Sequence, residues 1–259
     1  MRSARRLLRR KERTALGQFL AEGRQAVGEA LARPGTVTDL LVGDDVVGRH
    51  QDLLGAAAET GVRVGTVPPA LLATLSDTVT PQGVLAVCDS VDVPLATALA
   101  GSPRLVVLCD QVRDPGNLGT VVRCADAFGA DAVLVSTGSV DLYNAKTVRA
   151  STGSIFHLPV ALEVGLADAV ARARELGMAV YGADGGGSAS VDDLASTGRL
   201  GRPVLWVMGN EAWGLPAGDA ALLDDLVALP MYGRAESLNL STAAAVFLYA
   251  TATAQRAGS

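Results

Sequence analysis

The polar residues best suited to chemistry lie in two segments near the carboxyl end of the chain. Glu211 follows the apolar run Pro203–Met208 after a two-residue turn, Gly209-Asn210. Ser237 and Asn239 are two positions apart, so their side chains point the same way if the chain is extended there. Ligands of open parallel sheets gather at the carboxyl ends of the strands. We therefore expect a carboxylate, a hydroxyl and an amide to lie at one site.

A third segment, residues 110–123, has the pattern of a strand, a loop and a helix. Asp114-Pro-Gly predicts a turn, and Asn117 is expected to cap the helix by accepting from a free backbone N–H. The apolar residues that follow at helical spacing predict a buried stripe, and Arg123 projects away from it. Arg123 is either an ordinary surface arginine or a group that reaches a phosphate over the site or across a subunit interface.

Each of these residues also has a structural interpretation. Glu211 would be stabilised in the first turn of a following helix, where the helix dipole favours an acid. Ser237 and Asn239 would cap the C-terminal helix. The turn glycines Gly209 and Gly214 favour a functional interpretation because they allow a ligand to approach the backbone closely. Such a site suits a nucleoside-like ligand better than a metal.

The glycine-rich stretch 182–187 resembles a phosphate loop only superficially. It follows a strand, but residues 188–193 are not expected to open an apolar helix where a dinucleotide fingerprint requires one. The low-complexity run Gly185-Gly-Gly-Ser188 is interpreted as a flexible loop.

Two blocks of alternating strands and helices surround these segments. The alternation predicts a mostly parallel sheet with helices on both faces. We expect a small N-terminal α/β domain over 1–90, a linker over 91–103 and a second domain over 104–259. In the first block, helices are predicted over 10–17, 24–32, 51–60 and 69–75, and strands over 39–42, 62–67 and 84–88. In the second, strands are predicted over 105–109, 132–136, 178–181, 204–208 and 226–229, and helices over 118–128, 145–151, 166–175 and from about 241.

The charge is unevenly distributed. The chain has 22 basic and 27 acidic residues, but residues 1–33 carry nine basic groups against three acidic ones. This asymmetry indicates an arm that contacts a polyanion, with a solvated tail or a transit-like leader as the alternative. The residues expected to make the contact are Arg5, Arg6, Arg9, Arg10, Lys11 and Arg13.

Other features exclude several classes of protein. Cys88, Cys109 and Cys124 have no metal-type spacing, so we interpret them as reduced core residues of a cytoplasmic protein. His50 and His157 are isolated, which leaves no basis for a histidine-based metal site or triad. No apolar run reaches the ~18 residues of a membrane span, and no apolar run follows the basic start as in a secretory signal.

In order, the three segments resemble motifs 1, 2 and 3 of the SpoU/TrmH family of RNA 2′-O-methyltransferases, in the SPOUT superfamily. The motifs are Asn117-Leu-Gly-Thr-Val-Val-Arg123, Gly209-Asn-Glu-Ala-Trp-Gly-Leu215, and Leu229-Pro-Met with Ser237-Leu-Asn-Leu-Ser241. The match covers about residues 104–256. The first block, with Phe19-Leu-Ala-Glu-Gly23, is more weakly similar to the family's L30e-like substrate-binding domain.

The resemblance implies a trefoil knot in the second domain, a homodimer, and S-adenosyl-L-methionine bound in the knotted loops. The catalytic or RNA-contacting positions fall on Asn117, Arg123, Glu211, Ser237 and Asn239. The cofactor positions fall on Gly209, Leu229 and Leu238, with the adjoining Met208, Pro230 and Met231. Ala212 departs from the family, where glycine is commoner, and its methyl group would restrict the turn slightly.

The implied reaction is methyl transfer to a ribose 2′-hydroxyl, with RNA as partner and no metal or membrane. Arg123 is the family's proposed base, but arginine stays protonated, so an alternative is that it pairs with the adjacent phosphate. A separate N-terminal domain favours ribosomal RNA (23S) over transfer RNA. Two rivals remain: a non-catalytic RNA-binding protein, and another α/β enzyme, which would need a glycine-rich loop after the first strand of the second domain.

Overall fold

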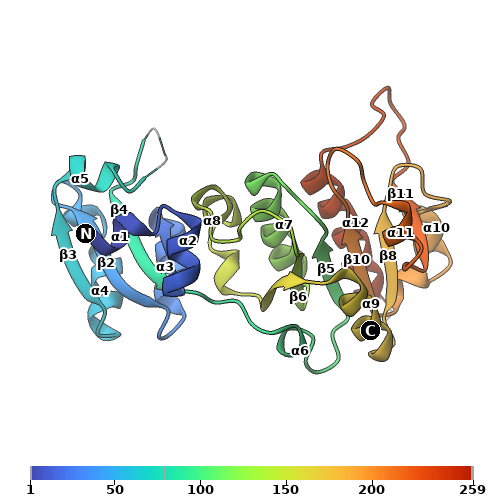
Figure 1. The fold of residues 1–259 in the computed structure, drawn as a ribbon, viewed down its shortest axis with the longest axis horizontal. Helices are drawn as coiled ribbons and strands as arrows, with labels where there is room; N and C mark the ends of the chain where they lie inside the picture. Colours follow the sequence, from blue (N-terminus) through green and yellow to red (C-terminus); the bar gives the residue numbers. More distant parts are fainter. Residues whose placement is uncertain (1, 77, 79, 258–259) are drawn as a thin grey trace. The chain divides into compact units, whose positions relative to one another are not determined.

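The structure is a computed structural model that describes residues 2–76, 78 and 80–257 (Figure 1). The chain forms two compact units. The first contains Met1–Val91 and Asp141–His157, and the second contains Asp92–Val140 and Leu158–Ser259. The unit boundaries therefore do not follow the chain alone, because a segment from the middle of the sequence packs with the N-terminal unit.

The first unit is built on a four-stranded mixed sheet with the order β1-β4-β2-β3. Strand β4 pairs antiparallel with both β1 and β2, and β2 pairs parallel with β3. Its strands are β1 (Gln18–Glu22), β2 (Val37–Gly43), β3 (Arg63–Val67) and β4 (Val84–Asp89), and its first helices are α1 (Arg2–Arg6), α2 (Arg10–Leu16), α3 (Arg24–Ala32), η1 (Val47–Arg49), α4 (Gln51–Glu59) and α5 (Pro69–Ala73). The sequence patterns predicted these elements except α1, η1 and β1.

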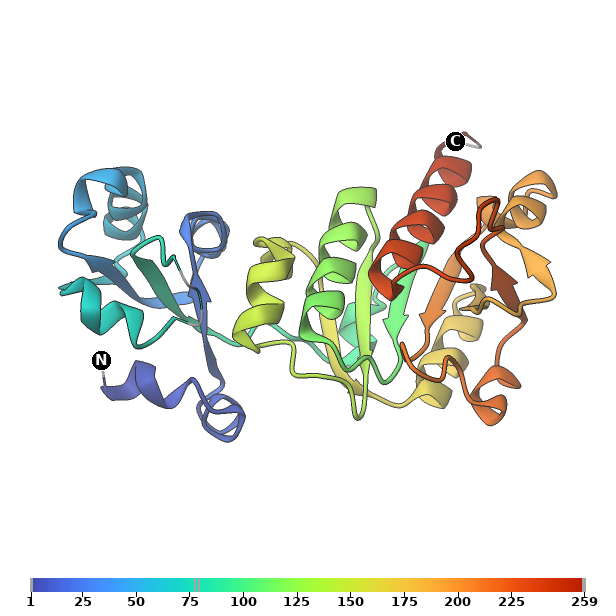
Figure 2. The ribbon, with the colours of Figure 1, turned by 90° about the horizontal axis from the view of Figure 1, so that it is seen from above.

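The basic N-terminal segment is part of this unit's core. Ala4 and Leu7 are each 2% exposed, and they cluster with Leu20, Leu72 and Leu85 on one face of the sheet. Helices α3 and α4 lie on the opposite face (Figure 2). The interpretation of this segment as a solvated tail is therefore wrong.

Residues 141–157 join the first unit through aromatic and ionic contacts. The segment contains α8 (Ala145–Ser151) and η2 (Ser154–Phe156). The ring of Phe19 in β1 lies 4.5 Å from the ring of Tyr143 and 6.0 Å from that of Phe156, measured between centroids. Glu22 accepts from Arg149 at 3.4 Å. These contacts give the Phe19–Gly23 motif a structural role.

The second unit contains a seven-stranded sheet with the order β7-β6-β5-β10-β8-β11-β9. All of its strand pairs are parallel. The strands are β5 (Leu105–Cys109), β6 (Ala132–Ser136), β7 (Val160–Val164), β8 (Ala179–Ala183), β9 (Ala189–Ser190), β10 (Val204–Met208) and β11 (Asp225–Ala228). The predicted parallel sheet is confirmed, although the sequence patterns missed β7 and β9.

Helices cover both faces of this sheet, as predicted: α7 and α12 lie on one face and α9 on the other (Figure 2). A short helix, α6, interrupts the predicted linker. The helices are α6 (Leu95–Ala98), α7 (Pro115–Phe128), α9 (Leu166–Glu175), α10 (Val191–Ser196), η3 (Arg199–Gly201), α11 (Ala217–Ala220) and α12 (Leu240–Ala257). Among the described residues, every helix is too short or too polar to cross a bilayer.

A buried aromatic stack fastens α12 to the sheet. Trp206 of β10 is fully buried, and its ring centroid lies 5.5 Å from that of Tyr181 and 4.4 Å from that of Phe247. The indole Nε1 donates to Thr251 Oγ1 at 2.9 Å, and the same hydroxyl donates to the Phe247 carbonyl at 2.8 Å. The other polar atom of the stack, the Tyr181 hydroxyl, accepts from Arg202 at 3.0 Å, so both have partners.

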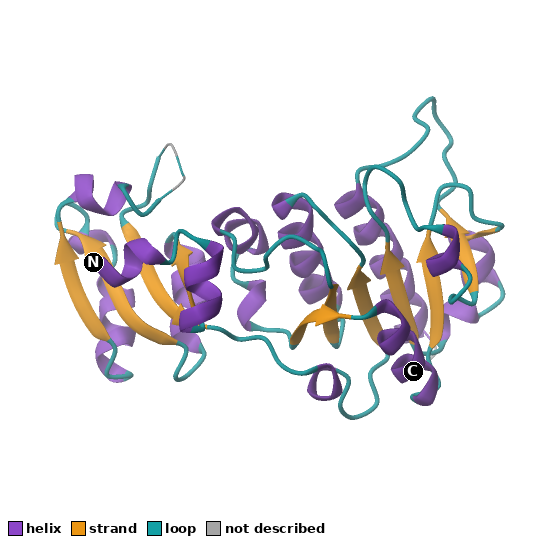
Figure 3. Cartoon of the chain, viewed as in Figure 1, coloured by secondary structure: helices purple, strands orange, loops and turns teal. Residues whose placement is uncertain are grey.

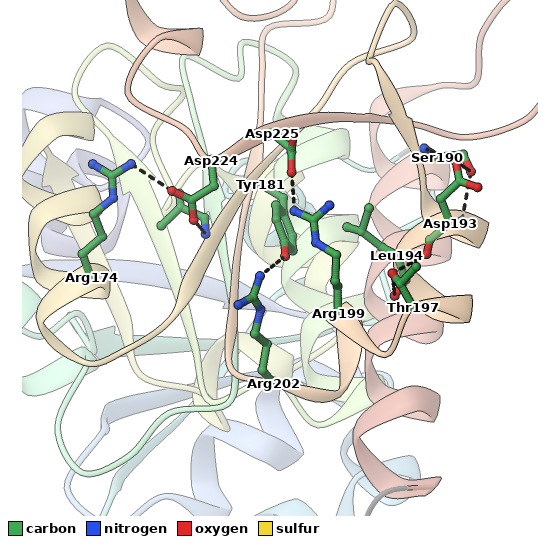
Figure 4. Close-up of polar contacts among 11 residues, drawn as sticks. Arg174, Tyr181, Ser190, Asp193, Leu194, Thr197, Arg199, Arg202, Asp224 and Asp225 are labelled. Atoms are coloured by element: carbon green, nitrogen blue, oxygen red, sulfur yellow. Dashed lines mark hydrogen bonds and ion pairs between the residues drawn. The ribbon is translucent and has the colours of Figure 1, made fainter.

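Polar contacts hold the outer strands of the sheet in place (Figure 4). Arg174 of α9 donates to Asp224 at 3.0 Å, and Asp224 accepts the Val180 amide at 2.8 Å. Arg199 forms an ion pair with Asp225 at the start of β11. Because β11 leads into the segment that contains Ser237 and Asn239, these contacts support one wall of the site described below.

We expect Thr251→Val to destabilise the second unit, because it leaves the buried Trp206 N–H without an acceptor. The free energy of unfolding should fall by about 1–3 kcal/mol. Thr253→Val is the matched control, because Thr253 is an exposed residue of the same helix. Chemical denaturation of both variants measures the difference, and equal stability of the two would contradict the role given to the Thr251 hydroxyl.

Candidate active site

A cavity of about 660 Å³ lies at the carboxyl ends of four strands of the second unit. The loops after β5, β8, β10 and β11 line it, together with the first residues of α12. In the sheet, β10 lies between β5 and β8 although it follows both in the chain. The loops are drawn in teal in Figure 3. Such a change in strand order is where open α/β sheets bind ligands.

Three of the predicted catalytic residues form one chain of hydrogen bonds in this cavity. Asn239 Nδ2 donates to Asn117 Oδ1 at 3.0 Å, and Asn117 Nδ2 donates to Glu211 Oε1 at 3.0 Å. The other carboxylate oxygen, Oε2, accepts from the Arg113 backbone N–H at 3.4 Å. The structure therefore brings together one residue from each of the three segments.

Asn239 also begins helix α12. Its Oδ1 accepts from the Ser241 backbone N–H at 2.9 Å and from the Ser241 hydroxyl at 2.7 Å. The capping interpretation of this residue is therefore correct, and it holds together with the contact to Asn117. Ser237 and Leu238 line the cavity beside it.

Glu211 lies in a tight turn rather than in a helix, so the helix-dipole interpretation is wrong. Backbone hydrogen bonds between Asn210 and Gly214, at 3.0 and 2.9 Å, close this turn. The Asn210 side chain accepts from the Ala212 amide at 2.8 Å and donates to the Gln111 carbonyl at 2.7 Å. Ala212 does not have a positive φ, so the turn accommodates its methyl group without backbone strain.

The loop after β5 is strained and contains a buried acid. Gln111 has φ +52°, in the left-handed region that side chains other than glycine rarely adopt. The Asn210 contact and a hydrogen bond from the Gln111 amide to Ser136 at 2.8 Å hold it there. Burial raises the pKa of the neighbouring Asp110 carboxyl. Such strain persists only where surrounding contacts enforce it.

Two of the three cysteines are fully buried in the core. Cys88 and Cys109 are buried, as expected, whereas Cys124 is only partly buried. Burial, together with the charges of Glu211 and Asp110, raises the pKa of Cys109 to about 12. The Cys109 thiol therefore stays protonated directly below the site.

The cap of helix α7 is not the residue that the sequence predicts. Asp114, not Asn117, is the N-cap, and its side chain accepts from the Asn117 backbone N–H at 2.9 Å. The helix thus begins at Pro115, a residue favoured in the first turn. This arrangement leaves the Asn117 carboxamide available for Glu211 and Asn239.

Most of the predicted cofactor positions line the cavity; Pro230 does not. Those that do are Gly209, Leu229, Leu238, Met208 and Met231. Gly209 has the clearest steric reason, because a Cβ there would lie 2.7 Å from the Gly214 carbonyl carbon and 2.9 Å from Leu215 Cγ. The residue must therefore be glycine for the turn to close as it does.

The sequence interpretation missed one wall of the cavity, which Ala183, Asp184 and Gly185 form after β8. The sequence pattern favours no ligand site in this stretch and predicts only a flexible loop from Gly185 onward. Helix α10 follows it, contrary to expectation, and begins with a capping box between Ser190 and Asp193. Ser-x-x-acid, together with the position after a strand, was the signal available in the sequence.

The cavity is lined by more acidic than basic groups. Asp114, Asp184, Glu211 and Glu236 line it, and Arg113 is the basic residue among the lining residues. A cationic ligand is therefore favoured there over an anionic one.

The basic residues predicted to contact RNA are exposed, except Arg13. Arg123 is exposed on α7 and is not among the cavity-lining residues. In the first unit, Arg5, Arg6, Arg9, Arg10 and Lys11 are exposed. Arg13 is only 8% exposed; its guanidinium donates to Asp141 at 3.0 Å through Nε and to the Leu7 carbonyl at 2.8 Å. The prediction that Arg13 contacts a polyanion is therefore wrong, because its donors are used inside the fold.

We expect Gly209→Ala to destabilise the protein by about 1–3 kcal/mol, because the new methyl group meets backbone atoms that have no room to move. Gly218→Ala is the control, since a Cβ at Gly218 has open space around it. Differential scanning calorimetry compares the two. An unchanged melting temperature for Gly209→Ala would show that the turn tolerates the methyl group.

Comparisons with known proteins agree with this geometry. Residues 104–249 match the SpoU rRNA Methylase family, and residues 1–86 match the MRM3-like substrate binding domain. The chain is 39% identical over 243 residues to the Bacillus subtilis 23S rRNA (guanosine(2553)-2′-O)-methyltransferase RlmP. The aligned residues cover 93% of this chain and 90% of that protein. It is 32% identical over 246 residues to the Streptomyces viridochromogenes 23S rRNA (uridine(2479)-2′-O)-methyltransferase, covering 93% and 84%.

Solved structures show the same fold. The SpoU methyltransferase AviRb from Streptomyces viridochromogenes, in complex with AdoMet, superposes with a TM-score of 0.85 at 31% identity, covering 100% of this chain and 98% of that one. The AdoMet-bound rRNA methyltransferase from Sinorhizobium meliloti gives 0.81 at 30% identity, covering 96% and 92%. The resemblance seen in the three motifs is confirmed: the chain belongs to the SpoU rRNA methylase family.

Proposed function

We propose that this protein transfers a methyl group from S-adenosyl-L-methionine to a ribose 2′-hydroxyl of 23S rRNA. The family, the rRNA 2′-O-methyltransferases among its relatives and the AdoMet-bound structures support this assignment. The observation that carries it is the hydrogen-bond chain from Asn239 through Asn117 to Glu211 at the edge of the cavity. Transfer RNA is the second candidate substrate.

The cavity fits the proposed cofactor. Its acidic lining suits a ligand with a sulfonium and an ammonium group. Gly209, Leu229 and Leu238 would hold the cofactor through backbone groups, with Met208 and Met231 beside them. When bound, S-adenosylmethionine supplies the activated methyl group, and the protein supplies position and electrostatics.

The polar residues of the motifs would orient the ribose. Ser237 offers a hydroxyl, and Asn239 is held by Asn117 on one side and by the start of α12 on the other. Arg123 would pair with the phosphate next to the target ribose and favour loss of the 2′-hydroxyl proton to that phosphate or to water. Holding both reactants in register is worth up to ~7–11 kcal/mol in favourable cases.

We propose that the protein acts as a homodimer and that Arg123 serves the cavity of the partner subunit. Val246 and Tyr249 of α12 are 40% and 59% exposed, and the Tyr249 ring packs edge-on against Phe128 of α7, with centroids 5.6 Å apart. Arg123 lies one turn before Ala127 on the exposed side of α7. This exposed apolar face lies beside Arg123, which does not line the cavity of its own subunit. A second copy of this chain would cover the face and could receive Arg123 in its cavity.

The remaining assignments follow from the same family. We propose that residues 1–90 bind the RNA substrate, that 91–103 link the domains, and that 104–259 form the methyltransferase domain, apart from residues 141–157, which pack with the first unit. The position of β10 between β5 and β8 is compatible with the family's trefoil knot. A protein that modifies ribosomal RNA would work in the cytoplasm.

Methyl transfer from labelled S-adenosylmethionine to unmodified 23S rRNA and transfer RNA transcripts tests the proposed function. We expect label on 23S rRNA, and nucleoside mass spectrometry should identify a 2′-O-methylated nucleoside. Label on transfer RNA alone would reassign the substrate. Failure to bind the cofactor at all would favour a non-catalytic RNA-binding protein.

We expect Arg123→Ala to lower methyl transfer roughly 10²–10³-fold while leaving cofactor affinity nearly unchanged, because the residue lies outside the cavity. Isothermal titration calorimetry gives the cofactor affinity and labelled transfer gives the rate. A large loss of cofactor affinity would contradict the phosphate-pairing role.

The same variant tests the dimer. Co-expression of Arg123→Ala with the cavity variant Glu211→Ala should restore about a quarter of wild-type activity, since half of all dimers would be mixed and each mixed dimer would contain one intact composite site out of two. No restoration would show that Arg123 serves its own cavity.

We expect the N-terminal arm to contribute to RNA affinity through charge. Deleting residues 1–13 would remove Ala4, Leu7 and Arg13 from the core, so substitution is the cleaner test. Arg5→Gln with Arg9→Gln should reduce the slope of log affinity against log salt by roughly 1.4–1.8. Arg49→Gln with Arg63→Gln, two exposed arginines elsewhere in the same unit, is the control. An equal change in both double variants would remove the special role of the arm.

A further inference from the structure

Trp213 is a large apolar side chain left exposed at the wall of the catalytic cavity. Its indole is 54% exposed, whereas Trp206, the other tryptophan of the chain, is fully buried. Trp213 lines the cavity two residues after Glu211, at the tip of the turn closed by Asn210 and Gly214. An exposed tryptophan beside a binding site is a feature that the fold itself does not require.

The turn that carries Trp213 is held by hydrogen bonds within itself and to the segment after β5. Asn210 and Gly214 exchange two backbone hydrogen bonds, and the Asn210 side chain ties the turn to the Ala212 amide and to the Gln111 carbonyl. Glu211, on the same turn, is held by Asn117. The backbone that presents the indole is therefore preorganised, so a ligand that stacks on it meets a low entropic cost.

Electrostatics show which kind of contact can attract RNA at this place. Four carboxylates and one arginine line the cavity, so its own charges oppose an approaching phosphate. A contact between an aromatic ring and a nucleobase does not depend on that charge, because every base has a π-face. RNA-binding proteins commonly stack unpaired bases on aromatic side chains.

We propose that Trp213 is the stacking platform for the nucleobase of the nucleotide whose ribose is methylated. This inference rests on the proposed function and adds to it the contact that holds the target base. Once unstacked from its RNA neighbours, the base lies on the indole, and its ribose is thereby placed beside Glu211, Asn117 and Asn239. Stacking accepts any base, so Trp213 positions the nucleotide without selecting its identity.

The test compares Trp213→Leu, which keeps apolar bulk but removes the π-face, with Trp213→Phe, which keeps a ring. The probe is an unmodified 23S rRNA transcript that spans nucleotide 2553, the position in the name of the Bacillus subtilis relative. Trp213→Leu should weaken RNA binding roughly ten- to a hundredfold, and Trp213→Phe should recover most of the loss. Cofactor affinity, dimer mass and the salt dependence of RNA binding should stay at wild-type values in both variants.

Tyr232→Leu is the matched control. Tyr232 is 90% exposed on the loop after β11, and it is not among the cavity-lining residues. If Tyr232→Leu weakens RNA binding as much as Trp213→Leu, the effect is a general loss of aromatic surface and the proposal is overturned. A loss of cofactor affinity or of the dimer in Trp213→Leu would overturn it as well.

An abasic transcript locates the contact. With the base of the methylated nucleotide removed, wild type and Trp213→Leu should bind the RNA with equal affinity. The intact transcript should quench the Trp213 fluorescence of the wild type, and the abasic transcript should not. A persistent difference on the abasic RNA would place the indole against another group. If wild type and Trp213→Leu methylate the intact transcript equally well, this inference is overturned and the proposed function stands. Absence of methyl transfer by the wild type would overturn the proposed function and this inference with it.

Discussion

The hydrogen bond between the carboxamides of Asn239 and Asn117 joins two segments that are 122 residues apart, and the site depends on it. Its direction is determined at both ends. Glu211, when ionised, only accepts hydrogen bonds, so Asn117 must turn its NH₂ group toward it and its oxygen toward Asn239. The amides at the start of α12 only donate, so Asn239 must turn its oxygen toward them. A carboxamide carries both an acceptor oxygen and a donor NH₂ group, so it satisfies both demands at each step.

This chain of contacts also explains why the helix caps fall where they do. Asp114 takes over the start of α7 and thereby leaves the Asn117 side chain for the site. Asn239 serves as a cap and as a site residue at once, because its two polar atoms point to different partners. The structural and the functional interpretations of such residues are therefore compatible. A cap at the mouth of a cavity fixes the side chain that the chemistry uses.

The charges of the protein divide between cofactor and RNA. The cavity is lined mainly by carboxylates, which suits a cationic cofactor and opposes phosphate. Exposed basic side chains gather instead on α1 and α2 of the first unit, and Arg123 lies on α7 outside the cavity. Attraction of RNA and binding of the methyl donor thus depend on different groups, so salt weakens the first more than the second.

Local patterns in the sequence predicted most strands and helices of this protein, because the spacing of apolar residues determines which side chains share one face of an element. Apolar runs of strand length and helical stripes predicted the parallel sheet. Three short motifs indicated Asn117, Gly209, Glu211 and Asn239 as site residues, and all four line one cavity in the structure. The tertiary structure alone decided the partners. Burial turned Arg13 from a candidate RNA contact into an internal ion pair, packing moved residues 141–157 into the first unit, and strand order brought the loop after β8 into the cavity. Spacing along the chain determines which side chains share a face, whereas pairing across a sheet depends on contacts between residues that the sequence keeps far apart.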